Sequence, residues 1–162
     1  TEEGVQIGPL VDDNAVAGSH ELVEDAVARG ATVTTGGQIP DRDGSFYPAT
    51  VLTGVVAGTR LLTEEIFGPV LAIVPFDTED EAVALANATE YGLISYVYTT
   101  DLNRGMRMID RLETGMMGLN AGVISNAAAP FGGVKQSGIG REGSFEGIDE
   151  YLTTKYTFVP KS

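Results

Sequence analysis

Between Leu71 and Asn120 the chain alternates apolar strands with amphipathic helices, and this alternation restricts the fold more than any other feature. Expected strands cover residues 71–76, 93–98 and 116–120, and the first begins with a run of four apolar residues typical of a buried strand. Strands joined through helices by short connections pair in parallel, with right-handed crossovers. The sequence therefore predicts an α/β fold: a doubly wound, mostly parallel sheet with helices on both faces.

The two helices between these strands carry their own start signals. Thr78 and Glu81 form a capping box, and Asp101 is placed to cap the second helix. The second helix has an apolar line that we assign to its inner side, as core packing before a binding surface. That line consists of Leu102, Met106, Ile109 and Leu112.

The first 36 residues predict a further helix and a strand. Acids and Asn at positions 12–14 indicate a helix start, and Gly30 ends the helix. Val16, His20, Val23 and Val27 recur at helical spacing, so we expect them on the buried face. A lone histidine on such a line indicates a hydrogen-bonded packing residue, not a catalyst. A short strand follows at residues 31–35.

The next segment is less regular. Residues 38–45 are rich in turn formers and predict an exposed loop. From Phe46 to Val56 the pattern is strand-like, but Pro48 and Gly54 interrupt it. We therefore expect two short edge strands, because proline is tolerated mainly at sheet edges.

Composition excludes several classes of function. The 162 residues hold 23 acids and 10 bases, a net charge of −13, which disfavours nucleic-acid and membrane partners. Cysteine is absent and His20 is the sole histidine, so neither a zinc thiolate site nor a multi-histidine metal site is predicted, and no cysteine nucleophile lies in this chain. No apolar run approaches the ~18 residues of a membrane helix. We expect a soluble cytoplasmic protein, and since the chain starts at Thr1, a piece of a longer one.

The segment Thr63–Val70 combines two acids, an aromatic ring and a Gly-Pro bend just before the first strand of the alternating region. A carboxylate held there can accept hydrogen bonds from a sugar diol, and a ring can cover the flat face of a heterocycle. These are the contacts that the ribose-nicotinamide end of a dinucleotide needs. A helix-terminal acid pair with a core phenylalanine explains the same residues, and both interpretations stay open at this point.

The last forty residues contain two further features. Residues 121–143 are a long glycine-rich connection, which in a compact domain is usually functional. The G-x-G-x-x-G match at 138–143 is not a dinucleotide fingerprint, because no apolar strand precedes it and the acid expected about 20 residues later would fall beyond Ser162. Nearby Lys135 and Arg141 are assigned structural roles.

Residues 151–159 form an alternating strand that must pair with another strand, most naturally one of a partner subunit.

Two long motifs carry a resemblance to a known family. Glu64-Glu65-Ile66-Phe67-Gly68-Pro69-Val70 is followed about sixty residues later by the run from Pro130 to Gly143. Together with Gly8-Pro9-Leu10, Gly36-Gly37 and Tyr91-Gly92-Leu93, these motifs resemble the aldehyde dehydrogenase superfamily over essentially the whole chain. Residues 122–125 and 147–152 are most similar to the succinate-semialdehyde branch, whose pattern glutarate-semialdehyde enzymes largely share.

The resemblance implies roles for four residues. Glu65 matches a carboxylate that hydrogen-bonds the nicotinamide ribose, and Phe67 an aromatic ring beside the nicotinamide of NAD or NADP. Ser125 matches a hydroxyl that contacts the distal carboxylate of a semialdehyde substrate, and Phe131 a wall of the substrate tunnel. The resemblance also implies a catalytic domain at residues 1–146, incomplete at its N-terminal side. Residues 147–162 would be a crossing segment and a strand for self-association into a homodimer or homotetramer.

The resemblance also implies what this chain does not contain. The family attacks the aldehyde with a cysteine thiolate and hydrolyses the resulting thioester with a glutamate base. That cysteine, that glutamate, the pyrophosphate-binding half and the arginines that hold the substrate carboxylate would all precede Thr1. No catalytic residue is therefore assigned here. The implied parent oxidises succinate semialdehyde to succinate, and the alternatives are another aldehyde dehydrogenase or a binding or assembly module without catalysis.

Overall fold

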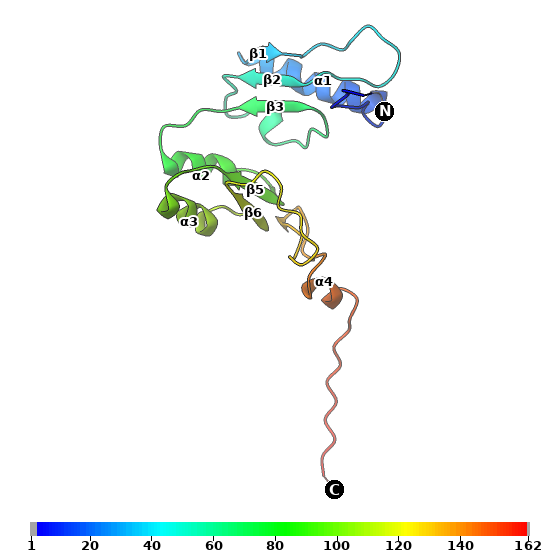
Figure 1. Ribbon diagram of the computed structural model, residues 1–162, viewed down its shortest axis with the longest axis vertical. Coiled ribbons are helices and arrows are strands. Elements are labelled where there is room, and N and C mark those ends of the chain that lie inside the picture. The colour runs from blue at the N-terminus through cyan, green and yellow to red at the C-terminus, as the bar shows by residue number, and fades with distance from the viewer. Residues whose placement is uncertain (1–2, 162) are drawn as a thin grey trace. The chain divides into compact units, whose positions relative to one another are not determined.

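The computed structural model describes residues 3–161, which form two compact units divided between Thr78 and Glu79 (Figure 1). Helices and strands are mixed in both units, which confirms the α/β class. Two pairs of strands are parallel, β2 with β3 and β5 with β6. The doubly wound arrangement and the division at residue 146 stay predictions.

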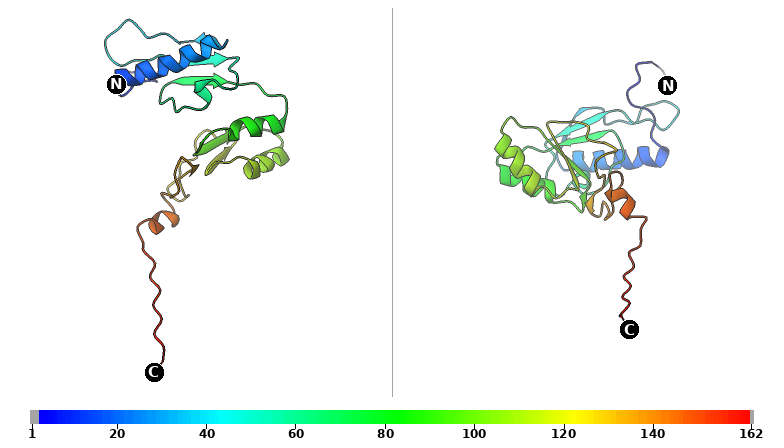
Figure 2. Two further views of the ribbon diagram at one scale, coloured as in Figure 1. Left: turned by 180° about the vertical axis from the view of Figure 1, so that it is seen from behind. Right: turned by 60° about the horizontal axis from the view of Figure 1, so that its bottom comes forward.

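The first unit is a three-stranded sheet with one helix. Strands β1 (Thr32–Thr35), β2 (Thr50–Thr53) and β3 (Val70–Ile73) lie in that order, with β1 antiparallel to β2. Helix α1 (Asp13–Ala28) lies behind the sheet in Figure 1 and in front of it in the reversed view of Figure 2. Asp12 caps α1 by accepting a hydrogen bond from the Ala15 amide at 2.9 Å, as the acids at its start predict.

The core of this unit lies between α1 and the sheet, and the predicted inner face of α1 is only partly correct. Val16 and Val23 are buried, but Val27 is 46% exposed and His20 is half-buried. The helix instead packs through a stripe that includes small residues, because these let it approach the sheet closely. The buried residues of α1 are Val16, Ser19, Leu22, Val23 and Ala26.

Two predictions about the strands of this unit are wrong. Residues 46–56 contain one central strand, β2 (Thr50–Thr53), not two edge strands, and Leu52 within β2 is fully buried. Strand β3 is not buried on both faces, since Leu71 and Ile73 are 58% and 44% exposed. Successive strand residues point to opposite faces, and α1 covers only the face that carries Val70 and Ala72.

The second unit contains α2 (Glu79–Asn87), β4 (Tyr91–Gly92), β5 (Ile94–Val97), α3 (Leu102–Arg111), β6 (Met116–Leu119), β7 (Val134–Lys135) and the short α4 (Glu146–Asp149). Strand β4 pairs antiparallel with β7. Asp101 caps α3 through the Arg104 amide at 3.1 Å, which confirms that prediction. Thr78 directly precedes α2, at the position that the capping box requires.

The predicted inner face of α3 is wrong. Leu102, Met106 and Ile109 are 70%, 52% and 46% exposed, whereas Gly105 and Met108 are buried. Gly105 explains the difference, because a Cβ there would lie 2.9 Å from a methyl group of Leu119 on β6. Helix α3 therefore packs on β6 through the face that carries Gly105, where no side chain intervenes. Hydrophobic periodicity does not detect this face, because glycine is not counted as an apolar residue.

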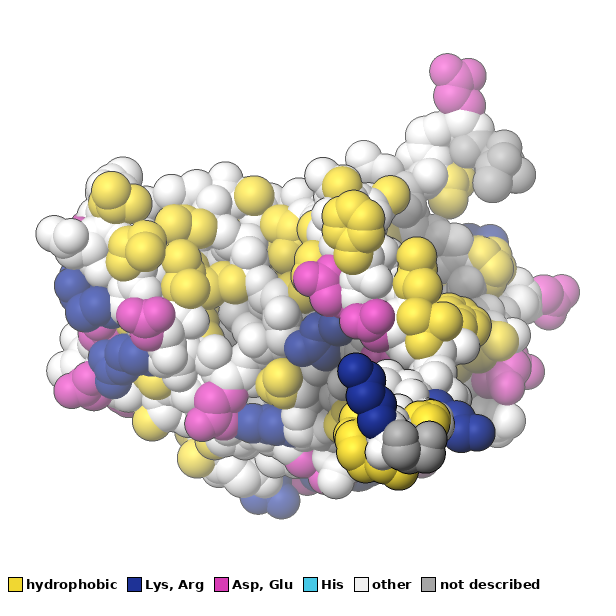
Figure 3. All heavy atoms as spheres, turned by 90° about the horizontal axis from the view of Figure 1, so that it is seen from below, with side chains coloured by type: hydrophobic (Ala, Val, Ile, Leu, Met, Phe, Trp, Pro, Cys, Tyr) yellow, Lys and Arg dark blue, Asp and Glu magenta, His cyan; other side chains and the backbone are white. Residues whose placement is uncertain are grey.

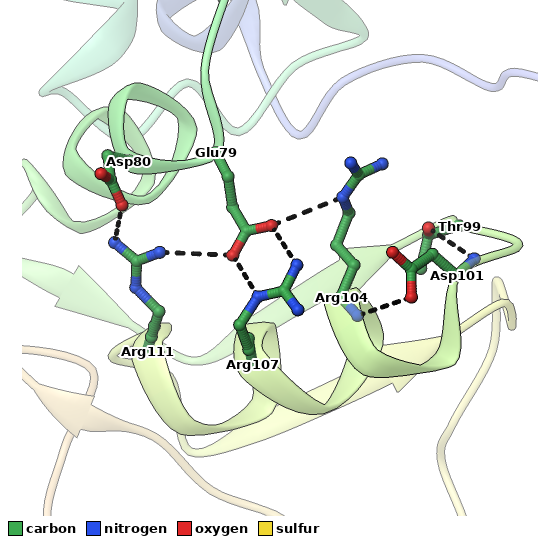
Figure 4. Close-up of polar contacts among 7 residues, drawn as sticks. All are labelled: Glu79, Asp80, Thr99, Asp101, Arg104, Arg107 and Arg111. Atoms are coloured by element: carbon green, nitrogen blue, oxygen red, sulfur yellow. Dashed lines mark hydrogen bonds and ion pairs between the residues drawn. The ribbon is translucent and has the colours of Figure 1, made fainter.

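Helices α2 and α3 are joined by an ionic cluster at their surface (Figure 4). The Glu79 carboxylate accepts two hydrogen bonds from Arg107, both at 2.7 Å, and lies 3.4 Å from Arg104 and 3.3 Å from Arg111. Arg111 also donates to Asp80 at 2.6 Å. The hydrogen bonds from Arg107 are the largest cause of a lowered pKa at Glu79, from 4.5 to about 2.

This cluster predicts an acid-sensitive second unit. The stabilisation from ionised Glu79 is fully present above pH 4.5, the ordinary value for a glutamate, and is lost as pH falls toward about 2. We expect Glu79→Gln to lower the urea midpoint at pH 7, and the gap to the wild type to close on acidification. A Glu90→Gln variant, which changes an acid outside the cluster, serves as the control. A difference in urea midpoint between Glu79→Gln and the wild type that stays constant from pH 7 to pH 2 would contradict this prediction.

Residues 151–161 form no strand within the described part of the chain. Residues 152–161 have no strand pairing, and Tyr151, Tyr156 and Phe158 are 89%, 84% and 71% exposed. Figure 3 shows the molecule from below, with hydrophobic side chains exposed at the surface among charged ones. Across residues 3–161, no helix is both long and apolar enough to span a membrane.

Candidate active-site walls

The first candidate wall is the turn between the 3-10 helix η1 (Arg60–Leu62) and β3. On one side, the amides of Thr63 and Glu64 donate to the Arg60 carbonyl at 3.0 and 2.9 Å. On the other side, the Thr50 amide of β2 donates to the Pro69 carbonyl at 2.8 Å. Residues 64–68 are therefore held between two fixed ends.

The two acids of this turn have different surroundings. Arg60 donates to both carboxylate oxygens of Glu64, at 2.6 and 2.8 Å, and these hydrogen bonds lower the pKa of Glu64. Glu65 is exposed and has no hydrogen bond or ion pair within residues 3–161. Its carboxylate is thus the acid of the pair that is free to accept hydrogen bonds from a ligand. The spacing of Arg60 and Glu64, four residues apart, is the signal that separates the two roles.

Phe67 is the most unusual residue of the turn. Its φ is +46° and its side chain is 81% exposed. A non-glycine residue in this conformation costs about 1–3 kcal/mol and persists only where its surroundings fix it. The interpretation as a core phenylalanine is therefore wrong. The structure presents a ring whose faces are available for stacking, two residues from an unpaired carboxylate.

The second candidate wall lies in the other unit, at the carboxyl ends of the parallel strands β5 and β6. The Asn120 amide group donates to the carbonyl of Thr99 and accepts from its N–H, both at 2.9 Å. This pair of bonds joins the two strand ends and fixes where the long loop starts. Ser125 lies exposed on that loop. The sequence places Asn120 at the end of a strand but does not predict this pair of hydrogen bonds.

Phe131 begins the return of the same loop. Its amide and carbonyl exchange two hydrogen bonds with Glu142, both at 2.7 Å, and its side chain is 39% exposed. It lines a hollow of about 740 Å³ together with Arg141 and Tyr151. Ser125 does not line that hollow, so the structure places both predicted substrate residues on one loop without joining them. Glu65 and Phe67 belong to the first unit.

The basic residues of this loop are structural, as predicted. Arg141 donates to the carbonyls of Gly133 and Gly140 at 2.7 and 2.8 Å. Lys135 donates to the Asn87 carbonyl at 3.0 Å and pairs with Glu113 at 2.6 Å. These contacts give both cations a role in holding the loop.

His20 also has the role predicted for it. Its ring lies 3.2 Å from the Tyr47 hydroxyl and 3.6 Å from the Glu24 carboxylate. Burial is the main reason that the pKa of Tyr47 is raised above 10.0. Within residues 3–161, no group of three or more His, Asp or Glu side chains is arranged to hold a metal ion.

Comparison with known proteins identifies the family. The family model described as "Aldehyde dehydrogenase family" matches residues 1–157. The chain is 53% identical over 156 residues to a succinate-semialdehyde dehydrogenase of Paenarthrobacter nicotinovorans, covering 96% of this chain and 35% of that protein. It is 51% identical to the mitochondrial succinate-semialdehyde dehydrogenase of Mus musculus, covering 96% and 30%.

Comparison with solved structures points to the same family. The crystal structure of an E. coli NADP-dependent enzyme superimposes with a TM-score of 0.93 at 47% identity, covering 96% of this chain and 32% of that one. The chain spans about a third of the length of the curated relatives it matches. The family model covers both units and all four predicted site residues. The chain therefore belongs to the aldehyde dehydrogenase family.

Proposed function

We propose that this chain supplies nucleotide-binding and substrate-binding residues to an NAD(P)-dependent semialdehyde dehydrogenase that oxidises succinate semialdehyde to succinate. The observation that supports the proposal most strongly is the turn that bears Glu65 and Phe67. An unpaired carboxylate and an exposed ring, the latter on a residue with a positive φ, are presented together on a segment fixed at both ends.

These residues fit the nicotinamide end of a dinucleotide. The ionised Glu65 carboxylate can accept hydrogen bonds from both hydroxyls of a ribose, and such charge-assisted bonds are the stronger kind. The Phe67 ring can lie against the nicotinamide and keep water from that face. When bound, NAD or NADP supplies the hydride acceptor. The similar E. coli enzyme is NADP-dependent, but either nucleotide fits this turn, because the proposed contacts involve neither the adenine nor its ribose.

On the substrate side, Ser125 and Phe131 are proposed to contact the semialdehyde. The exposed Ser125 hydroxyl would donate a hydrogen bond to the carboxylate distal to the reacting aldehyde. Phe131 would form an apolar wall along the short carbon chain between the two groups. The relatives named as succinate-semialdehyde dehydrogenases support this choice of substrate.

The chemistry also needs a nucleophile, and the 162 residues contain no cysteine. We therefore expect the purified chain to reduce neither NAD nor NADP with succinate semialdehyde, while the complete product of the gene that encodes these residues reduces one of them. The measurement is nucleotide reduction followed by absorbance, with glutarate semialdehyde as a comparison substrate. Turnover by the chain alone would contradict the proposal. A complete protein inert toward every aldehyde would favour a binding or assembly role.

We further propose that residues 151–159 pair with a sheet edge of a second subunit. Their exposed aromatic side chains and their lack of pairing within the chain support this role. Deleting residues 151–162 from the complete protein is expected to reduce its mass in solution from a dimer or tetramer to a smaller species, measured by light scattering. Substituting Lys161→Gln, which leaves the segment in place, is the control. An unchanged mass after deletion would contradict this role.

A further inference from the structure

Helix α1 contacts the turn of Glu65 and Phe67 at one point through a buried hydroxyl. Ser19 is fully buried, and its side-chain oxygen has no hydrogen-bond partner within the described residues. A Cβ on Gly68 would overlap that oxygen and lie 3.2 Å from the Ser19 Cβ. The backbone of Gly68 therefore rests directly on Ser19, in a space that admits no side chain.

The same helix contacts the other end of the turn through Asp25. One carboxylate oxygen of Asp25 accepts a hydrogen bond from the Arg60 backbone amide at 3.0 Å. Arg60 is the first residue of η1, and its side chain holds Glu64. Asp25 is itself held by Arg29, whose Nε lies 3.1 Å from both carboxylate oxygens. The two contacts of α1 thus lie at residues 60 and 68, on either side of Glu65 and Phe67.

We propose that Ser19 and Asp25 are positioning residues for the Glu65–Phe67 turn, and that they set where the carboxylate and the ring are presented. This inference rests on the proposed function of the turn. Phe67 has a backbone conformation that must be imposed by its surroundings, and the two contacts from α1 supply that constraint on either side. A displacement of about 1 Å at a residue that orients a reactant can cost about a hundredfold in rate.

The test at the Ser19 end is a rescue experiment in the complete enzyme. Gly68→Ala is expected to lower the single-turnover rate of hydride transfer by about tenfold or more, because the new methyl group pushes the turn off α1. Ser19→Ala removes the overlapping oxygen, and Ser19→Gly removes the Cβ as well. The rate should therefore rise from Gly68→Ala to the double variant with Ser19→Ala, and further with Ser19→Gly. If each Ser19 substitution changes the rate of hydride transfer by the same factor with and without Gly68→Ala, the proposal is overturned.

The test at the Asp25 end compares two substitutions. Asp25→Asn keeps an oxygen that can accept from the Arg60 amide, and should retain most of the nucleotide affinity. Asp25→Ala removes the acceptor and should weaken nucleotide binding, measured as the Kd for NADH or NADPH by fluorescence. If both variants have the same Kd for the nucleotide at a temperature where both are folded, Asp25 does not position the turn.

Hydrogen exchange separates this inference from the proposed function. Amides 64–68 should exchange faster in Gly68→Ala and return toward the wild-type rate in the double variants, whatever the turn binds. If exchange is rescued but Glu65→Gln does not alter hydride transfer, the proposed role of the turn is wrong and the positioning by α1 stands. If Glu65→Gln slows hydride transfer and neither rate nor exchange is rescued, the positioning is wrong.

Discussion

Replacing Glu65 by Gln in the complete dehydrogenase is expected to slow hydride transfer by about tenfold to a hundredfold, because a hydrogen bond to a charged group contributes about 1.5–3 kcal/mol. Gln keeps the size of the side chain and removes the charge that would attract both ribose hydroxyls. Since Glu65 is exposed and unpaired within residues 3–161, the free energy of unfolding should change by less than about 0.5 kcal/mol.

The measurement is a single-turnover rate of nucleotide reduction, with urea unfolding of the same protein in parallel. Asp43→Asn is the matched control, since it makes the same acid-to-amide change on an exposed loop of the same unit. An unfolding free energy that falls by several kcal/mol with an unchanged rate would show that Glu65 is structural.

Gly115→Ala is expected to destabilise the second unit by about 3 kcal/mol, near the upper end for overpacked sites. A Cβ at Gly115 would overlap the Gly132 carbonyl oxygen and lie 2.8 Å from the Gly133 Cα. These neighbours are backbone atoms, so no side chain can rotate away to make room. The substitution would push the start of β6 away from the segment that begins with Phe131, and urea unfolding of the chain measures the loss.

Gly18→Ala supplies the opposite result in the same experiment. Gly18 lies on the exposed side of α1, and a Cβ there would meet no atom within 4 Å. Alanine in a helix interior is favoured over glycine by about 1 kcal/mol, so this variant should be more stable than the wild type. If Gly115→Ala is tolerated as well as Gly18→Ala, the close backbone contact at β6 is not formed.

The sequence predicts the elements of this fold better than their packing. The helix at residues 13–28, its Asp12 cap, the Asp101 cap and the parallel strands near residues 94 and 116 follow from local signals. The sequence does not predict the burial of strands 50–53 and 70–73 correctly, because burial depends on which faces of a sheet are covered. No local pattern in β3 shows that α1 covers one face only.

The inner faces of α1 and α3 show the same limit. Hydrophobic periodicity assigns Val27 and Met106 to the core, and both are exposed. Instead, α1 meets the turn before β3 through Ser19, and α3 meets β6 through Gly105, where the absence of a long side chain allows close approach. Small residues carry no signal in a count of apolar positions, yet they determine how a helix is rotated about its axis.

The candidate site divides in the same way. The octapeptide at residues 63–70 indicates which groups are offered, a carboxylate and a ring. It does not show that Glu64 is held by Arg60 while Glu65 is unpaired, or that Phe67 adopts a positive φ. The first point depends on the fold of η1, and the second on contacts from both ends of the turn.

The most direct test is a crystal structure of the complete enzyme with NAD or NADP bound. The account predicts a Glu65 carboxylate oxygen within hydrogen-bond distance, about 2.5–3.0 Å, of a hydroxyl of the nicotinamide ribose, with the Phe67 ring in contact with the nicotinamide. A bound nucleotide whose ribose is held by other groups, with Glu65 facing solvent, would contradict it.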